Sequence, residues 1–278
     1  MTGQLWLVST PIGNLGDLPP RAVATLRACA LICCEDTRHS GKLLSHAGVA
    51  GVRLAVANEH TEDARAAEVL ELLASGHDVA VLTDAGTPGI SDPGARLVRA
   101  AIADGHRVSA VPGPAALVMG LVLSGFETTR FVFEGFLPRS GKDRAQRIAE
   151  IASERRTIVL YEAPHRVHRT VTDLLAACGP DRQVALAREL TKLHEETWRG
   201  TLAEAAAHVA ETEPRGEYVL IVDGASLVVA DASDEAVSDA LRMALAGGAD
   251  RRTAIATVTA ATGANKRRVY DLALTIPR

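Results

Sequence analysis

The chain has 278 residues, of which 47% are hydrophobic and only 3% aromatic, so its cores must be aliphatic. This length suffices for about two domains. The formal net charge of −4 excludes a wholly basic nucleic-acid-binding surface but permits local basic patches. The four cysteines form no zinc-like spacing, which favours free thiols in a reducing compartment. With no apolar run long enough for a bilayer and no signal peptide, we expect a cytoplasmic protein without membrane segments or a metal requirement.

Apolar runs predict five strands in the first part of the chain, at residues 5–9, 31–34, 53–57, 79–82 and 108–111. Helical patterns separate them, beginning at Pro20, before Ala66 and near Ala95. Each strand is followed by a charged loop or by one rich in glycine and proline. Strand ends of this kind predict a mostly parallel sheet with one functional edge.

The longest of these loops runs from Asp84 to Gly94 and contains three glycines and two prolines. Ordinary connections between a strand and a helix need about two to six residues. Glycine allows unusual backbone angles and close approach of the main chain to a ligand. We therefore predict a binding loop at a strand end, with Asp92 capping the helix that follows.

The second part of the chain repeats the pattern, with strands expected at 131–136, 158–161, 184–187 and 218–222. Residues 137–147 are basic and predict an exposed loop entering a helix. From residue 230 the strand signals stop, and helices are expected at 234–246, 251–261 and 266–274. We predict two α/β domains, residues 1–113 and 114–226, and a helical segment, residues 230–278.

The helical segment has a local excess of positive charge. Two of its helices surround a turn at Gly263, which resembles a helix-turn-helix, although a solvated face explains the same residues equally well. Five side chains are candidates for contact with phosphate groups, namely Arg251, Arg252, Lys266, Arg267 and Arg268.

Several familiar catalytic patterns are missing from the sequence. No GxGxxG motif follows a strand, and neither GxSxG nor HExxH occurs. A stretch from Gly135 to Lys142 approaches a phosphate-binding loop, but Asp143 stands where Ser or Thr is required. His60 and His165 each follow a strand, where a lone histidine is more often a cap or a surface residue than a catalyst.

Six motifs occur in one fixed order: residues 9–15 (STPIGNL), 35–38 (EDTR), 84–94 (DAGTPGISDPG), 112–114 (PGP), 161–166 (YEAPHR) and 188–192 (RELTK). Their series resembles the branch of the tetrapyrrole methylase superfamily that modifies ribosomal RNA, over residues 5–224. The resemblance implies two α/β domains with a cofactor cleft between them, S-adenosylmethionine as cofactor, and a homodimer. It implies 2′-O-methylation of a cytidine ribose in 16S rRNA of the small subunit. Methylation of a tetrapyrrole precursor and a non-catalytic RNA-binding role are the alternatives.

The resemblance also assigns candidate binding residues. Those expected around the cofactor are Pro11, Ile12, Thr87, Ile90, Ala115, Ala116 and Tyr161. Substrate contacts are expected from His60, Arg166 and the five basic residues of the helical segment. The family often has Ser at positions 115 and 163 and His at position 57, where this chain has Ala. A hydroxyl contact from Ala115 is therefore lost, although its backbone amide is retained.

Transfer of a methyl group to a hydroxyl requires alignment and removal of the hydroxyl proton. The charged strand ends offer Asp36, Glu59, His60 and Glu189 as bases, with Arg38, Arg166 and Lys192 as cations. We place Asp36 and Glu189 first because each lies beside a basic residue in its motif, which gives Arg38 and Lys192 as their catalytic partners. A salt bridge that merely ties the two domains together explains these pairs almost as well.

Overall fold

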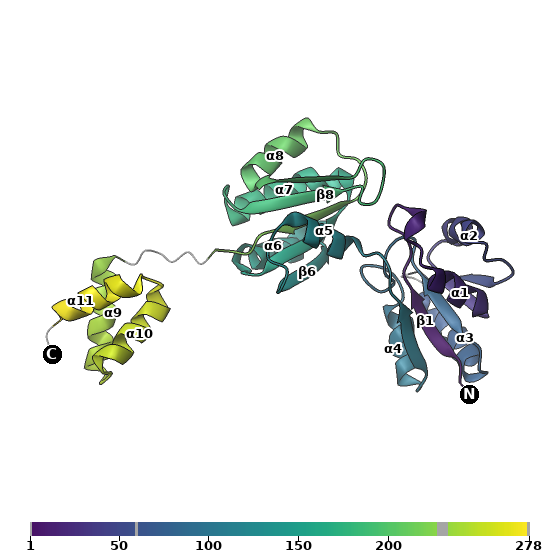
Figure 1. Ribbon diagram of the computed structural model, residues 1–278, viewed down its shortest axis with the longest axis horizontal. Coiled ribbons are helices and arrows are strands. Elements are labelled where there is room, and N and C mark those ends of the chain that lie inside the picture. Colours follow the sequence, from purple (N-terminus) through teal and green to yellow (C-terminus); the bar gives the residue numbers. More distant parts are fainter. Residues whose placement is uncertain (1, 59–60, 227–232, 277–278) are drawn as a thin grey trace. The chain divides into compact units, whose positions relative to one another are not determined.

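The computed structural model describes residues 2–58, 61–226 and 233–276, which form two compact units (Figure 1). The first unit, Met1–Gly224, holds two five-stranded sheets with helices around them. The second unit, Ala225–Arg278, is helical. This architecture confirms the predicted fold class of two α/β sheets followed by a helical segment.

The first sheet is entirely parallel, with strand order β3-β2-β4-β1-β5. Its strands are Gln4–Val8 (β1), Leu31–Cys34 (β2), Arg53–Val56 (β3), Val79–Leu82 (β4) and Arg107–Val111 (β5). Its helices are Leu15–Asp17 (η1, a short 3-10 helix), Pro20–Ala28 (α1), Thr37–His46 (α2), Glu62–Ala74 (α3) and Ala95–Ala103 (α4). The predicted parallel sheet is confirmed here. Helix α2 was not predicted, because its sequence is largely polar.

Hydrophobic cores lie on both faces of this sheet. Cys33 belongs to one cluster, with Leu5 and Val81, and Cys34 to the other, with Val8. Adjacent strand residues point to opposite faces, so the two thiols cannot bind one metal ion. Both are free, and burial raises the pKa of Cys33 to about 12.

The second sheet has the order β6-β7-β10-β8-β9 and is mixed. Only β6 and β7 pair in parallel, and the other neighbouring strands pair antiparallel. Its strands are Phe131–Phe136 (β6), Thr157–Glu162 (β7), Gln183–Arg188 (β8), Glu196–Thr201 (β9) and Tyr218–Val222 (β10). Its helices are Ala116–Ser124 (α5), Gly141–Ser153 (α6), Pro164–Cys178 (α7) and Leu202–Glu211 (α8). Strand β9 and helix α8 were not predicted.

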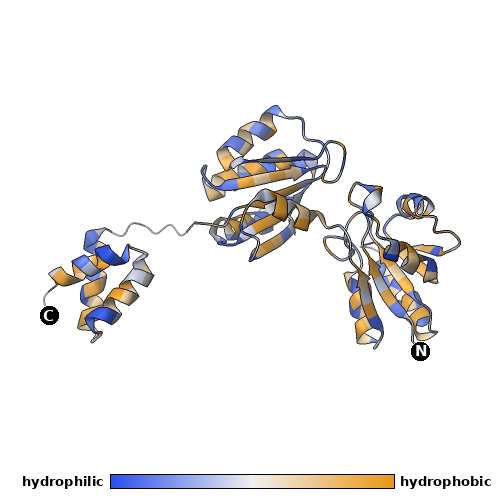
Figure 2. Ribbon diagram, viewed as in Figure 1, coloured by the Kyte–Doolittle hydropathy of each residue, from blue (hydrophilic) through white to orange (hydrophobic). Residues whose placement is uncertain are grey.

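The second unit comprises helices Asp234–Ala246 (α9), Arg251–Thr262 (α10) and Lys266–Thr275 (α11). Each helix mixes hydrophobic and hydrophilic residues, and the hydrophobic ones form a separate small core that includes Val237, Leu241 and Val258 (Figure 2). Side chains cap the three helices at Ser233, Asp250 and Asn265. In the described ranges of the chain, no helix is both long and apolar enough to cross a membrane.

Helix α4 is capped by a residue far away in the sequence. The carboxylate of Glu62, only 3% exposed, accepts hydrogen bonds from the backbone N–H groups of Gly94 (3.0 Å), Arg96 (2.9 Å) and Leu97 (3.0 Å). The predicted cap, Asp92, is wrong: the N-cap is Gly94, with φ of +126° and no capping side chain. Glu62 therefore ties α3 to the helix that follows the glycine-rich loop.

Replacing this carboxylate should destabilise the protein strongly. Glu62→Ala leaves three N–H groups without their acceptor, two of them buried, and we expect the free energy of unfolding to fall by about 2–4 kcal/mol in urea denaturation. Its neighbour Asp63 pairs with Arg96 at the surface, so Asp63→Ala should cost less than about 1 kcal/mol. Equal losses in the two variants would contradict the capping role.

Candidate functional site

A pocket of about 310 Å³ lies along the predicted binding loop. This volume is at the lower end of the range for small-molecule sites. Strand ends of both sheets in the first unit contribute to it. The lining residues are Ile12, Glu35, Asp84, Ala85, Gly86, Thr87, Ile90, Ser91, Asp92, Ala115, Ala116, Phe136, Tyr161, Glu162, Glu189, Leu190, Lys192, Glu217, Tyr218 and Val219.

Backbone hydrogen bonds hold the binding loop against the loop after β1. Thr10 and Gly86 exchange N–H to carbonyl hydrogen bonds of 2.8 and 3.2 Å, and Gly86 has φ of +86°. The Thr87 hydroxyl donates to the Pro114 carbonyl (3.2 Å) and lies 3.1 Å from the Ser9 hydroxyl. Thr87 therefore links three of the six sequence motifs.

Three residues other than glycine adopt left-handed backbone angles in the described part of the chain: Ser91 (φ +60°), Glu189 (φ +52°) and Thr191 (φ +66°). Ser91 and Glu189 line the pocket, and Thr191 lies between Leu190 and Lys192, which also line it. Such strained angles cluster at functional sites. Gly216 makes room for one of them, since a Cβ there would overlap the Glu189 carboxylate.

The pocket lining is acidic. Six carboxyl groups and one lysine lie among the described lining residues. Burial, together with the nearby Glu35, Glu217 and Asp84, raises the pKa of Asp92 to about 6. Burial, with Asp84 and Asp36, also raises the pKa of Glu35. The described residues include no group of three His, Cys, Asp or Glu side chains able to hold a metal ion.

One buried carboxylate oxygen in the pocket lining has no hydrogen-bond donor among the described residues. Asp84 Oδ1 is buried and unpaired with any described residue. Leaving a buried acceptor unsatisfied costs about 1–3 kcal/mol. A ligand that donates a hydrogen bond would remove this cost.

Tyr161 forms part of the apolar wall and caps a helix. Its hydroxyl accepts the N–H of Leu117 (3.0 Å), in the first turn of α5, where the side chain of Ala115 makes no cap. Burial raises its pKa. Its ring packs edge-on against Phe133, with ring centres 5.0 Å apart, and lies 5.6 Å from Phe136. The predicted residue Tyr161 thus joins the start of α5 to the end of β7.

Glu189 and Lys192 form an ion pair in the pocket, with Lys192 Nζ 2.8 Å from Glu189 Oε1. Both side chains are partly exposed, at 22% and 35%. Loop packing fixes their position, because a Cβ at Gly13 would overlap the Lys192 side chain and crowd the Leu190 carbonyl. The loop after β1 therefore contacts the loop after β8.

The other predicted catalytic pair, Asp36 and Arg38, lies outside the lining residues. Asp36 caps α2 through the Arg38 N–H (2.8 Å) and pairs with its guanidinium (2.8 Å). Hydrogen bonds from Arg38 hold the pKa of Asp36 well below its usual range. Arg38 is 88% exposed. The predicted cofactor residue Pro11 is buried beside the lining residue Ile12 and does not itself line the pocket.

The predicted substrate residues are dispersed. Arg166 Nη2 donates to the Leu137 carbonyl (2.6 Å) and Arg166 Nε lies 3.1 Å from Glu162, so its guanidinium is used internally. His60, like the base candidate Glu59, lies outside the described residues. In the second unit, Arg251 donates to the Ile276 carbonyl, and Arg268 pairs with Asp234. The other three predicted residues of this unit are exposed and form no ion pair with described residues, namely Arg252, Lys266 and Arg267.

The sequence prediction included part of the pocket. Eight of the predicted residues line the pocket, namely Ile12, Thr87, Ile90, Ala115, Ala116, Tyr161, Glu189 and Lys192. The sequence prediction gave no role in the pocket to five lining carboxylates, and it assigned Asp92 only as a helix cap. These five are Glu35, Asp84, Asp92, Glu162 and Glu217. Four of these five lie within the quoted motifs, and three of them, Glu35, Asp84 and Glu162, lie within two residues of a strand end.

Together, the two sheets and the pocket at their strand ends define an α/β protein whose pocket has the position and size of a small-molecule site. Residues 4–206 match the family model described as Tetrapyrrole (Corrin/Porphyrin) Methylases. The chain is 45% identical over 273 residues, 98% of each chain, to "Ribosomal RNA small subunit methyltransferase I" of Synechocystis sp.. A Xylella fastidiosa protein of that name is 49% identical over 81% of this chain and 82% of its own.

A solved structure gives the same fold. The uroporphyrin-III-C-methyltransferase from Thermus thermophilus is similar, with a TM-score of 0.53 and 23% identity, over 80% of this chain and 94% of that one. The chain belongs to the tetrapyrrole methylase family and, within it, to the family of ribosomal RNA small subunit methyltransferase I.

The raised pKa of Asp92 predicts a pH-dependent stability. Between about pH 4 and 6 the folded chain binds a proton at Asp92 that the unfolded chain releases, so this group's contribution to the free energy of unfolding falls as pH rises through that window. Asp92→Asn removes the unfavourable charge, and at about pH 7.5 the variant should be more stable than the wild type by roughly 1–3 kcal/mol.

Chemical denaturation at about pH 4 and pH 7.5 measures this difference, which should nearly vanish at the lower value. Asp17→Asn, on an exposed residue, serves as the control and should show no such dependence. An Asp92→Asn effect of the same size at both pH values would show that the charge on Asp92 is not its cause.

Proposed function

We propose that this chain transfers a methyl group from S-adenosylmethionine to the ribose 2′-hydroxyl of a cytidine in 16S rRNA. The observation that carries the proposal is the pocket lining, in which apolar side chains stand beside carboxylates. S-adenosylmethionine combines an apolar-faced adenine with a positive sulfonium and a positive ammonium group, and such a lining suits it. The RNA substrate is taken from the printed name of relatives that match nearly the whole chain.

The residues present fit this cofactor. Ile12, Ile90 and Tyr161 provide apolar surface, and the unsatisfied Asp84 Oδ1 provides an acceptor for a ligand N–H or O–H group. The lining also includes the small side chains and the backbone of Thr87, Ala115 and Ala116. Pro11 is the buried neighbour of Ile12 and holds it in place. When bound, S-adenosylmethionine supplies a methyl group on a sulfonium, which is a good leaving group.

We assign proton removal to Glu189. Lys192 holds Glu189 Oε1 at 2.8 Å, while Glu189 Oε2 has no hydrogen bond to any described residue. With the cofactor bound, Glu189 Oε2 would accept the proton of the ribose hydroxyl, and Lys192 would stabilise the carboxylate and any negative charge on the ribose oxygen. Asp36 and Arg38 stay candidates, but a carboxylate with a depressed pKa that caps a helix is a weaker base.

The turnover numbers of variants distinguish Glu189 from Asp36 as the base. Glu189→Gln should lower kcat about 100-fold or more, because general-base catalysis contributes about 10²–10⁴-fold, while the dissociation constant for S-adenosylmethionine changes little. Asp36→Asn should lower kcat much less, and the exposed Glu213→Gln serves as the control. Full turnover in Glu189→Gln, measured by methyl transfer at saturating cofactor, would exclude Glu189 as the base.

The second unit is the proposed site of additional RNA contact. Arg252, Lys266 and Arg267 are exposed there and available for phosphate groups, whereas Arg251 and Arg268 contribute through their backbone and ion-pair contacts to its packing. We retain the division into residues 1–113, 114–226 and 230–278 as a functional proposal. A cytoplasmic location accords with a ribosomal substrate.

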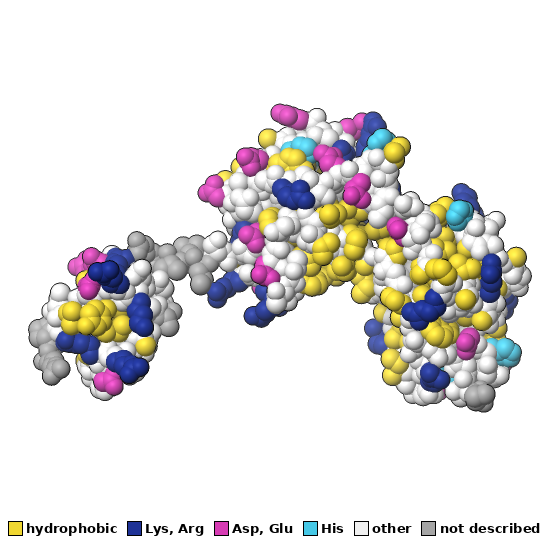
Figure 3. All heavy atoms as spheres, viewed as in Figure 1, with side chains coloured by type: hydrophobic (Ala, Val, Ile, Leu, Met, Phe, Trp, Pro, Cys, Tyr) yellow, Lys and Arg dark blue, Asp and Glu magenta, His cyan; other side chains and the backbone are white. Residues whose placement is uncertain are grey.

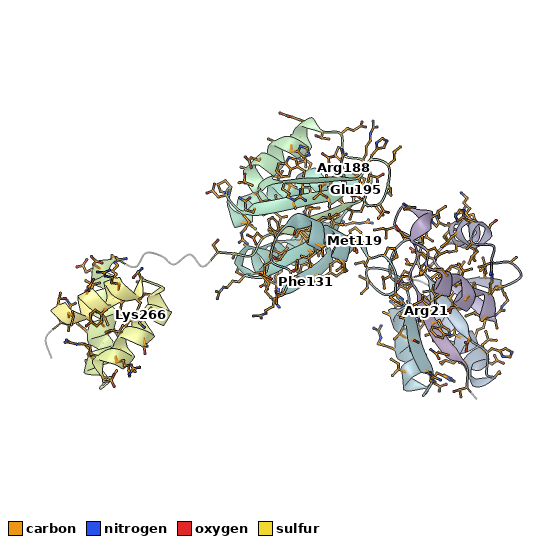
Figure 4. The ribbon with its side chains drawn as sticks, in the orientation of Figure 1. Arg21, Met119, Phe131, Arg188, Glu195 and Lys266 are labelled. Carbon is orange, nitrogen blue, oxygen red and sulfur yellow. The ribbon has the colours of Figure 1, made fainter. Side chains whose placement is uncertain are left out.

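A homodimer is the proposed assembly. Helix α5 contains no charged residue, yet Val118 and Val122 are 41% and 57% exposed, and Phe131 on the edge strand β6 is 39% exposed. Hydrophobic side chains gather over α5 and β6 in Figure 3, and Figure 4 labels Met119 and Phe131 in this region. Exposed apolar surface of this kind favours burial by a second copy. The molar mass in solution tests the assembly.

The proposed reaction is tested by methyl transfer from labelled S-adenosylmethionine to small ribosomal subunits that lack their native modifications. We expect label on one cytidine ribose, located by nuclease digestion and mass spectrometry, and no label with Glu189→Gln. Label on a tetrapyrrole precursor and none on RNA would overturn the proposal in favour of that substrate. A chain that S-adenosylmethionine does not stabilise would instead be a non-catalytic RNA-binding protein.

A further inference from the structure

The segment between β6 and α6 is held by three arginines at three consecutive carbonyl groups. Arg166 donates to the Leu137 carbonyl (2.6 Å), Arg144 to the Pro138 carbonyl (3.1 Å) and Arg169 to the Arg139 carbonyl (3.1 Å). The segment follows Phe136, which lines the pocket. Its backbone is therefore fixed directly beside the proposed active site.

Two of these arginines are themselves fixed by buried groups. Arg144, whose side chain is 4% exposed, binds Asp173 (2.8 Å) and Thr170 (2.9 Å). The Thr170 hydroxyl donates to Glu162 Oε2 (2.6 Å), and Glu162 Oε1 pairs with Arg166 (3.1 Å). Glu162 is a fully buried pocket residue. This network connects the pocket wall to the segment and makes Arg144 and Arg166 positioning residues.

The fixed segment and the first turn of α6 present positive charge to solvent. Arg139 and Lys142 are exposed, and neither forms an ion pair within the described ranges. Arg169 is 60% exposed and lies 3.8 Å from Asp173, which Arg144 already binds more closely. His165 and His168 lie on the exposed face of the same helix, α7. A positive surface is thus built next to an acidic pocket.

We propose that Arg139, Lys142 and Arg169 form a docking surface for the RNA sugar-phosphate backbone beside the pocket. The inference rests on the proposed function and adds a substrate-binding surface on the first unit. Phosphate contacts fix the register of a nucleic acid, so this surface positions the target ribose. The three arginines already order the backbone of this segment before RNA binds. RNA binding therefore loses less conformational entropy here than it would at a mobile basic loop.

The double variant Arg139→Gln/Lys142→Gln tests the surface, with small ribosomal subunits lacking their native modifications as the RNA probe. We expect its dissociation constant for the subunits to rise about 10-fold and the slope of log affinity against log salt to fall by about 1–2, because two phosphate contacts are lost. Its dissociation constant for S-adenosylmethionine should stay within about twofold of the wild type, since neither residue lines the pocket.

The matched control is Arg130→Gln/Arg155→Gln. Both residues are exposed, form no ion pair with described residues, and precede β6 and β7, at the opposite end of these parallel strands. We expect wild-type subunit affinity from it. An unchanged salt slope in the Arg139/Lys142 variant, or an equal loss in the control, would overturn the docking surface.

The two proposals fail in different ways. A wild-type chain that binds subunits but transfers no methyl group to RNA would overturn the proposed function. Normal methyl transfer together with unaltered subunit binding by the Arg139/Lys142 variant would overturn the docking surface alone.

Discussion

Partial burial of several carboxyl groups in one pocket, together with their mutual repulsion, is the constraint on which the site depends. Six of them share the lining with a single lysine, and the pKa of Asp92 rises to about 6 as a result of burial and its neighbours. The rest of the fold holds these groups together against that repulsion: Glu62 fixes the helix after the binding loop, and Gly216 leaves room for Glu189. A cationic ligand would turn this unfavourable arrangement into binding energy.

Much of the fold follows from the sequence, because the buried strands have uninterrupted apolar runs. Residues 31–34 and 79–82 were predicted with the observed bounds, and all of them are buried. Strand β9 escaped prediction because it is a partly exposed edge strand with the sequence ETWRGT. It pairs with β8 through backbone hydrogen bonds, and neither an alternation of apolar residues nor a strand-like composition marks this stretch in the sequence. The antiparallel pairing in the second sheet has a different explanation. Buried central strands show no alternation of polar and apolar residues in either kind of sheet, so their sequence does not indicate the direction of pairing.

The site was predictable where it depends on local motifs and was not where it depends on tertiary contacts. Thr87 and Tyr161 could be named from their loops, and the structure places them in the pocket lining. Asp36 and Glu189 looked equivalent in sequence, since each has a basic neighbour. They differ because Asp36 caps a helix outside the pocket, whereas the left-handed backbone of Glu189 places its carboxylate in the lining. Arg166 looked like a phosphate ligand, but the nearby Leu137 carbonyl and Glu162 occupy its guanidinium.

The central claim is that one cofactor contacts both the binding loop after β4 and the loop after β8. Hydrogen–deuterium exchange with and without saturating S-adenosylmethionine measures this directly. We predict slower exchange of backbone amides in residues 84–94 and 188–193 together, with residues 234–276 unchanged. Protection of only one of these loops, or of neither, would contradict a shared site.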